Sequence, residues 1–162
     1  MPSQRAEKDA CDLLDADHKA VKKLFNAYDE LAGSKARASV QKRLEIARQI
    51  CQELTVHAQI EEEIFYPALR AAIKETDMLA EAEVEHASAK ELIAQIEGLS
   101  EPDEMYDAKV KVLGEYIDHH VKEERNEIFP KARANRKLDL IGMRDQLATR
   151  KEELMGEMEV MA

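Results

Sequence analysis

Several residue types are scarce in this sequence. It has no tryptophan, five glycines, four prolines and two cysteines, and aromatic residues make up 4% of its 162 residues. A chain with few glycines and prolines but much alanine, glutamate, leucine and lysine has the composition of long helices rather than of a sheet. Cys11 and Cys51 are too few for a disulfide framework and favour a reduced, cytoplasmic setting.

Long apolar runs and an excess of positive charge are also missing. No stretch approaches the roughly 20 apolar residues of a membrane span, and the first ten residues, MPSQRAEKDA, lack the apolar core of a signal peptide. The formal charge of −10 opposes binding to nucleic acid or to an anionic membrane, because both attract positive surfaces. We therefore expect neither as a partner.

Five helices are predicted by apolar residues that recur at steps of three and four. This spacing places them on one helix face, as in the seams of a bundle. Gly33 and Gly98 are expected to follow the ends of two helices, Pro67 to loosen the end of the second helix, and Pro130 to end the fourth. The predicted helices cover about residues 7–31, 39–70, 77–97, 100–130 and 137–158.

Four amphipathic helices with short connections predict an all-α fold, an antiparallel up-down-up-down four-helix bundle over about residues 7–130. Residues 137–158 add a C-terminal helix whose methionine-rich end is expected to pack on the bundle and fray. No linker separates these parts, so residues 1–162 are expected to form one domain.

One internal repeat carries the most informative residues. His57 to Pro67 reads HAQIEEEIFYP, and His120 to Pro130 reads HVKEERNEIFP. Both copies have a histidine, a glutamate four residues later, an aromatic residue at the ninth step and a proline at the tenth. Residues four apart lie on one helix face, so each copy presents an imidazole and a carboxylate together.

Each predicted hairpin adds one more histidine from its first helix. Six polar residues thereby occupy seam positions where the apolar rhythm calls for leucine or isoleucine: His18, His57, Glu61, His86, His120 and Glu124. Burying an ionised carboxylate in a dry core is costly unless an opposite charge compensates it. Since no seam lysine or arginine does so, metal ions are the expected source of positive charge.

The ligand set indicates which metal. Imidazole and carboxylate groups inside a helix bundle suit non-haem iron or manganese, whereas zinc tends toward four ligands. Six residues on two related halves suit two ions, each with two histidines, bridged by Glu61 and Glu124. A metal-free network of neutral Glu–His hydrogen bonds is the alternative. It would suffice for one buried histidine, but six coordinated positions on four helices disfavour it.

The pattern H-HxxxE-H-HxxxE, with an aromatic residue and a proline after each HxxxE, resembles the hemerythrin-like (HHE cation-binding) family over about residues 10–132. The resemblance implies a four-helix bundle around a non-haem di-iron centre, oxo- or hydroxo-bridged, with Glu61 and Glu124 as bridging carboxylates. It also implies reversible binding of dioxygen or related ligands. Bacterial relatives are associated with oxygen sensing or storage, iron handling, and responses to nitric oxide or peroxide.

The sequence departs from the oxygen-carrying hemerythrins, which have two histidines one turn apart on the third helix. Here the positions four residues either side of His86 are Ala82 and Lys90. The missing imidazole opens a position for peroxide chemistry or for another side chain. The candidates, each three or four residues before a histidine of the set, are Glu83, Tyr116 and Glu53. Glu62, Glu63 and Glu123 are expected on charged outer faces, and His119 is expected beside the site or in solvent.

Three functions agree with this set of residues. The leading hypothesis is a non-haem di-iron protein that binds dioxygen or another small oxygen or nitrogen species, for storage, sensing or delivery. The second is a di-iron enzyme that acts on peroxide or nitric oxide through the same six residues. The third is a helical interaction module that holds zinc or no metal. A binding protein is favoured over an enzyme, and iron over manganese or zinc.

Overall fold

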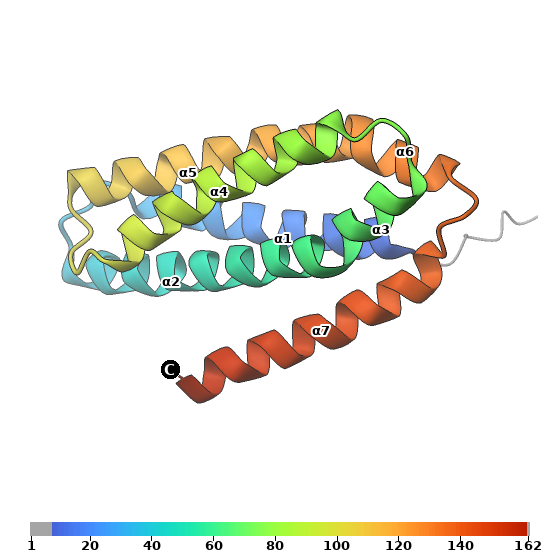
Figure 1. Ribbon diagram of the computed structural model, residues 1–162. Helices are drawn as coiled ribbons and strands as arrows, with labels where there is room; N and C mark the ends of the chain where they lie inside the picture. The colour runs from blue at the N-terminus through green and yellow to red at the C-terminus, as the bar shows by residue number, and fades with distance from the viewer. Residues whose placement is uncertain (1–7, 162) are drawn as a thin grey trace, which may run out of the picture.

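The structure is a computed structural model that describes residues 8–161 (Figure 1). Within that range every regular element is helical, so the predicted all-α class is confirmed. The elements in chain order are α1 (Ala10–Leu31), α2 (Arg37–Ile60), the π-helical turn η1 (Glu61–Phe65), α3 (Tyr66–Ala72), α4 (Asp77–Glu97), α5 (Glu104–Glu123), the π-helical turn η2 (Glu124–Ile128), α6 (Phe129–Ala134) and α7 (Leu140–Met161).

The long helices α1, α2, α4 and α5 lie side by side along most of the molecule (Figure 1). α1 packs on α2 and α5, and α4 packs on α5 and α2, so the four enclose a common interior. α7 lies outside this group, against α1, α2 and η1. The predicted start of the first helix at residue 7 falls outside the described residues. Across residues 8–161, no helix is long and apolar enough to cross a bilayer.

The ends of the helices follow local chemistry. Asp9 caps α1, because its side chain accepts a hydrogen bond from the backbone N–H three residues later. α1 then ends at Leu31, as predicted, and Gly33 adopts a φ of 81°, a conformation that costs glycine little. α4 has the predicted bounds, and Asp103 caps α5 through a hydrogen bond from the backbone N–H of Tyr106.

The two prolines of the repeat have different outcomes. The helix before Pro67 widens into a π-helical turn, in line with the predicted loosening, whereas Pro130 does not end its helix as predicted, because the chain stays helical through α6. A π-helical turn precedes each proline. In the first turn the backbone N–H of Tyr66 bonds to the carbonyl of Glu61, five residues back, and the second turn repeats this bond. The wider turn accommodates a residue that lacks an N–H and whose ring would clash within a regular α-helix.

The buried apolar residues form two clusters, one on each side of the six polar positions. On α1, His18 separates Leu14 of the first cluster from Val21 of the second, and on α4 His86 follows Ala82 of the first and precedes Ala89 of the second. Along α2 the order is reversed, with Leu54 of the second cluster before His57 and Ile60 of the first after it. α7 adds Leu147 and Leu154 to the first cluster. The polar residues are thus enclosed between two apolar layers, which keeps water from them.

A buried arginine ties α2 to α5 and to the turn after α1. Arg43 is 3% exposed, and its guanidinium donates to both carboxylate oxygens of Asp107 at 2.8 Å. It also donates to the backbone carbonyls of Pro102 at 3.0 Å and Ser34 at 2.6 Å. The hydroxyl of Tyr28 donates to Asp107 at 2.6 Å. This second buried polar cluster shares no residue with the six polar positions.

Candidate metal centre

The six predicted residues converge on one place in the interior. They come from six different elements: His18 from α1, His57 from α2, Glu61 from η1, His86 from α4, His120 from α5 and Glu124 from η2. All six are buried, and neither glutamate has any exposed surface. Each π-helical turn begins at the glutamate of its HxxxE motif. Such turns occur frequently at functional sites in helical proteins.

The four histidines form two similar pairs. The rings of His18 and His57 have centroids 4.9 Å apart and planes inclined at 62°. The rings of His86 and His120 have centroids 4.9 Å apart and planes inclined at 59°. In the second pair the two Nε2 atoms lie 3.3 Å apart. Two ring nitrogens in this position require a positive centre between them, either a proton or a metal ion.

Each glutamate lies between a histidine of one pair and a histidine of the other. The Oε1 atom of Glu61 is 3.2 Å from Nε2 of His57 and 3.2 Å from Nε2 of His86. The Oε1 atom of Glu124 is placed in the same way, 3.6 Å and 2.6 Å from the Nε2 atoms of the other two histidines. A carboxylate in this position is able to bridge two metal ions, one held by each pair.

Several polar atoms that face this interior make no hydrogen bond of good geometry, although histidine nitrogens lie close to them. Both carboxylate oxygens of Glu61 and Glu124 are buried without such a bond, and so are the Nε2 atoms of His18 and His57. A buried polar group without a partner costs roughly 1–3 kcal/mol, so native proteins rarely contain several together. Metal ions would satisfy all of these atoms, and the set of imidazole nitrogens and carboxylate oxygens fits iron, manganese or zinc.

A second layer of carboxylates holds the histidines, and no sequence pattern indicated it. Each ring donates from Nδ1 to a carboxylate oxygen: His18 to Asp15 (3.2 Å), His57 to Asp17 (3.0 Å), His86 to Glu62 (3.0 Å) and His120 to Glu85 (3.1 Å). A carboxylate only accepts hydrogen bonds, so Nδ1 carries the proton and Nε2 faces the centre. This is the usual way in which a metal-binding histidine is oriented.

The charges of the site change the protonation of its histidines. Burial lowers the pKa of His57, but the negative charge of Glu61 and the hydrogen bond to Asp17 outweigh this effect and raise the pKa to about 10. Burial also opposes protonation of His120, yet the surrounding carboxylates, first Glu124, raise its pKa to about 12. Without metal these rings hold protons, and a metal ion would displace them.

Tyr66 is a further residue of the site that the sequence analysis did not single out. Its hydroxyl lies 3.3 Å from Nε2 of His120 and 3.5 Å from Nε2 of His86. Burial, then the charges of Glu124 and Glu61, raise the pKa of this phenol well above its usual value. The available signal was the aromatic residue that both copies of the repeat carry one position before the proline.

The corresponding residue of the other copy lacks a hydroxyl. Phe129 stacks on the ring of His18, with centroids 6.1 Å apart and planes inclined at 14°. The two histidine pairs therefore have similar geometry but different neighbours. Only the pair of His86 and His120 has a phenol oxygen beside it among the described residues.

The three candidates for an additional ligand lie elsewhere. Glu83 is paired with Arg70 at 2.8 Å on the surface. Glu53 belongs to none of the three groups of histidines and carboxylates in residues 8–161 whose atoms lie close enough to hold a metal ion. Tyr116 lines the cavity above the centre but is 48% exposed.

Of the charged residues expected outside the centre, His119 is exposed and contacts Glu123 at 2.9 Å. Glu63 pairs with Arg150, whereas Glu62 turns inward to His86 and corrects that expectation.

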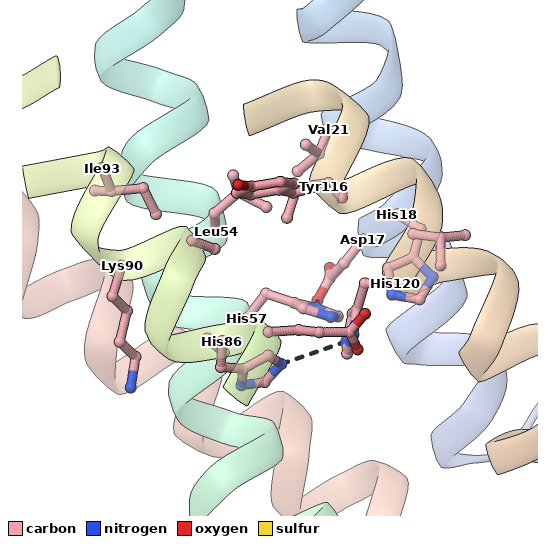
Figure 2. Close-up of a pocket in the computed structure, with 15 residues that line it drawn as sticks. Asp17, His18, Val21, Leu54, His57, His86, Lys90, Ile93, Tyr116 and His120 are labelled. Carbon is pink, nitrogen blue, oxygen red and sulfur yellow. Dashed lines mark hydrogen bonds and ion pairs between the residues drawn. The ribbon is translucent and has the colours of Figure 1, made fainter. Parts of the chain in front are cut away.

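A small cavity of about 40 Å³ opens onto the centre between α1, α2, α4 and α5. All four histidines line it together with apolar side chains such as Leu54, Ile93 and Ile117 (Figure 2). The ring of Tyr116 lies across it near Leu54, and Lys90 extends away from the histidines (Figure 2). A cavity of this size admits only a few heavy atoms.

Comparisons with known proteins agree with this geometry. The family described as the hemerythrin HHE cation binding domain matches residues 9–132. The chain therefore belongs to the hemerythrin HHE cation-binding family, and the resemblance drawn from the motif is confirmed. The match covers all six polar residues but ends before α7.

The chain is also similar to two individual proteins. The crystal structure of a hemerythrin HHE cation binding domain-containing protein from Mycobacterium kansasii has a TM-score of 0.76 and 23% identity, over 93% of this chain and 90% of that chain. This likeness shows the fold. A curated protein named DNA nickase from Nostoc sp. is 31% identical over 133 residues, which cover 82% of this chain. The chain spans 36% of the length of that relative.

Proposed function

We propose that this protein holds two non-haem iron ions and binds dioxygen or a related small oxygen or nitrogen species. One observation carries the proposal: Glu61 and Glu124 are fully buried, no lysine or arginine of the described residues pairs with them, and each lies between two pairs of histidines. Two ions would compensate both charges. Two histidines and two shared carboxylates give each ion four ligands, which leaves positions open on iron for a small molecule.

Each residue of the centre has a separate task in this proposal. His18 and His57 hold one ion, His86 and His120 hold the other, and the two glutamates are shared. When bound, the two iron ions supply one-electron changes to a small oxygen species. The proposed topology, an antiparallel up-down-up-down four-helix bundle with α7 as an additional helix, fixes the donors on packed helices rather than on loops.

The cavity supports a small and weakly polar ligand. Its wall beyond the histidines is formed mainly by aliphatic side chains, including Val21, Leu54 and Ile117. Such a wall offers few hydrogen bonds, so it favours a diatomic molecule over an organic substrate. The two cysteines are free and buried, which agrees with the proposed cytoplasmic location.

Elemental analysis and absorption spectra of the purified full chain test the proposal. We expect about two iron ions per chain and near-ultraviolet absorption that bleaches with dithionite and returns when oxygen is readmitted. Repeated cycles without net oxygen consumption would identify a binding protein. Manganese at the same stoichiometry would keep the centre but change its metal. One zinc ion per chain, or no metal after growth with ample iron, would contradict the proposal and leave a helical interaction module.

A di-iron enzyme that acts on peroxide or nitric oxide is the second candidate. Tyr66 favours it, because a phenol beside His86 and His120 is placed to exchange a proton with a small molecule held there. Sustained consumption of hydrogen peroxide or nitric oxide by the iron-loaded chain, lost in Glu61→Ala, would select the enzyme. Reversible cycling without consumption would select the binding protein.

A further inference from the structure

α7 lies outside the residues that match the family, yet it is packed against segments that carry the centre. It contacts α1, which holds His18, and α2 and η1, which hold His57 and Glu61. Met143, Leu147 and Leu154 of α7 are buried in the apolar cluster next to the centre (compare Figure 1). A helix packed in this place is able to act on the site through its polar side chains.

Lys151 is the side chain of α7 that reaches a residue in contact with the centre. It follows Leu147 by four residues and precedes Leu154 by three, so it stands on the apolar face of α7. Its Nζ atom lies 2.6 Å from Oδ1 of Asp17. The other oxygen of the same carboxylate accepts the Nδ1 hydrogen bond of His57 at 3.0 Å. One buried carboxylate therefore connects a lysine of α7 to a histidine of the centre.

The neighbouring residue makes a second connection. Arg150 donates to Glu63 at 2.8 Å, and Glu63 belongs to the π-helical turn that begins with Glu61. Together the two cations hold α7 to α1 and to η1. The apolar cluster alone would position α7 less specifically, since apolar contacts are not directional.

The other outer carboxylates have their partners within residues 9–132. Arg125 of η2 pairs with Asp15 at 2.7 Å, and Lys90 of α4 pairs with Glu62 at 2.6 Å. Glu85 lies 3.6 Å from the exposed ring of His119. Among the described residues, Asp17 is the outer carboxylate whose lysine or arginine partner comes from α7.

We propose that Lys151 is a positioning residue of the metal centre. It holds the carboxylate of Asp17, which holds the ring of His57 with Nε2 toward the metal, so α7 is part of the site. This inference rests on the proposed metal-binding function. Without Lys151, the buried charge of Asp17 loses its outer partner, and the carboxylate is drawn toward water and away from His57. Loss of such a partner typically weakens metal binding by about 10- to 100-fold.

The test compares Lys151→Met with Lys151→Arg and a matched control, Lys131→Met. Lys131 pairs with Glu75 at 2.7 Å, and its side chain is 44% exposed, against 33% for Lys151. Each full-length variant is loaded with iron and reduced, and the release of iron to a ferrous chelator is followed by absorbance. We expect Lys151→Met to release iron about tenfold faster than wild type. Lys151→Arg and Lys131→Met should release it at the wild-type rate.

A release rate of Lys151→Met equal to that of wild type would overturn the inference. So would a faster rate shared by Lys131→Met, because the effect would then follow any lost surface charge. Thermal unfolding with and without iron gives a second measurement. An equal loss of stability in both states would identify a packing role and also overturn the inference. A wild-type chain that holds no metal would instead refute the proposed function itself, before the variants are compared.

Discussion

In each histidine of the centre, the two ring nitrogens have different roles. Each of the four histidines gives Nδ1 to an outer carboxylate and turns Nε2 to the interior. Glu61 and Glu124 have no corresponding outer partner, so their oxygens remain available. The division of roles follows from chemistry, because an imidazole has two nitrogens to share and a buried carboxylate needs a positive charge beside it.

Neutralising one shared carboxylate tests this division. We expect Glu61→Gln to remain helical by circular dichroism but to hold at most one metal ion per chain instead of about two, because an amide is a poor bridging ligand. The measurement is elemental analysis after gel filtration. Glu53→Gln, one helical turn before His57 and in none of the groups of candidate metal ligands, is the matched control and should keep both ions. A full metal content in Glu61→Gln would contradict the assignment of that residue.

Removing the phenol beside the second pair of histidines tests the asymmetry of the centre. In Tyr66→Phe we expect the metal content to be unchanged and azide to bind about tenfold more tightly, because the hydroxyl no longer competes for that position. A tenfold change equals about 1.4 kcal/mol, close to the value of one hydrogen bond. The measurement is an azide titration followed by visible absorption. Phe129→Tyr is the converse variant at the related position, and an unchanged azide affinity in Tyr66→Phe would assign the phenol to packing.

At this scale the sequence predicts the inner residues better than the outer ones. Glu61 and Glu124 lie at a fixed step from a histidine and interrupt an apolar seam, so their burial follows from helical periodicity. Asp17 and Glu85 serve histidines on other helices, and only the packing of those helices brings them together. Tyr66 was present in the repeat, but its reach into the centre depends on the π-helical turn before it.

Among the helices and turns, too, the sequence predicts the features that depend on local signals better than the others. The bounds of α4 follow from apolar spacing and a glycine, which are local signals. The π-helical turns do not, because an α-helix and a helix with one wide turn have the same apolar pattern over a few residues. Pro130 was therefore expected to end a helix that in fact continues past it.

The buried ion pair of Arg43 and Asp107 joins α2 to α5, and its removal should change the stability of the fold but not the metal centre. Removing only the acidic partner in Asp107→Ala leaves the guanidinium of Arg43 buried and unpaired by a carboxylate. We expect a loss of about 3 kcal/mol in the free energy of unfolding, measured by urea denaturation. The metal content should stay at the wild-type value, since this cluster shares no residue with the centre.

The double variant Arg43→Met, Asp107→Leu is the control. Replacing both partners by apolar residues of similar size is often neutral, so the double variant should be more stable than Asp107→Ala. If both variants lost the same free energy, packing rather than the unpaired charge would explain the effect.

The whole molecule carries a strong negative charge, which bears on the relative named DNA nickase. Its formal charge of −10 repels phosphate backbones, and the chain spans 36% of that relative. We expect the metal-loaded chain neither to shift a DNA fragment at physiological salt nor to nick a supercoiled plasmid in the presence of magnesium. Gel assays measure both. Metal-dependent nicking that disappears in Glu61→Gln would contradict the expectation and assign nuclease chemistry to this centre.

The central claim is that two metal ions lie between the two pairs of histidines. Anomalous diffraction from crystals of the full chain, with data collected on both sides of the iron absorption edge, tests it most directly. The account predicts two iron peaks, one next to His18 and His57 and one next to His86 and His120, with Glu61 and Glu124 touching both. A single peak, or peaks outside this interior, would contradict the account.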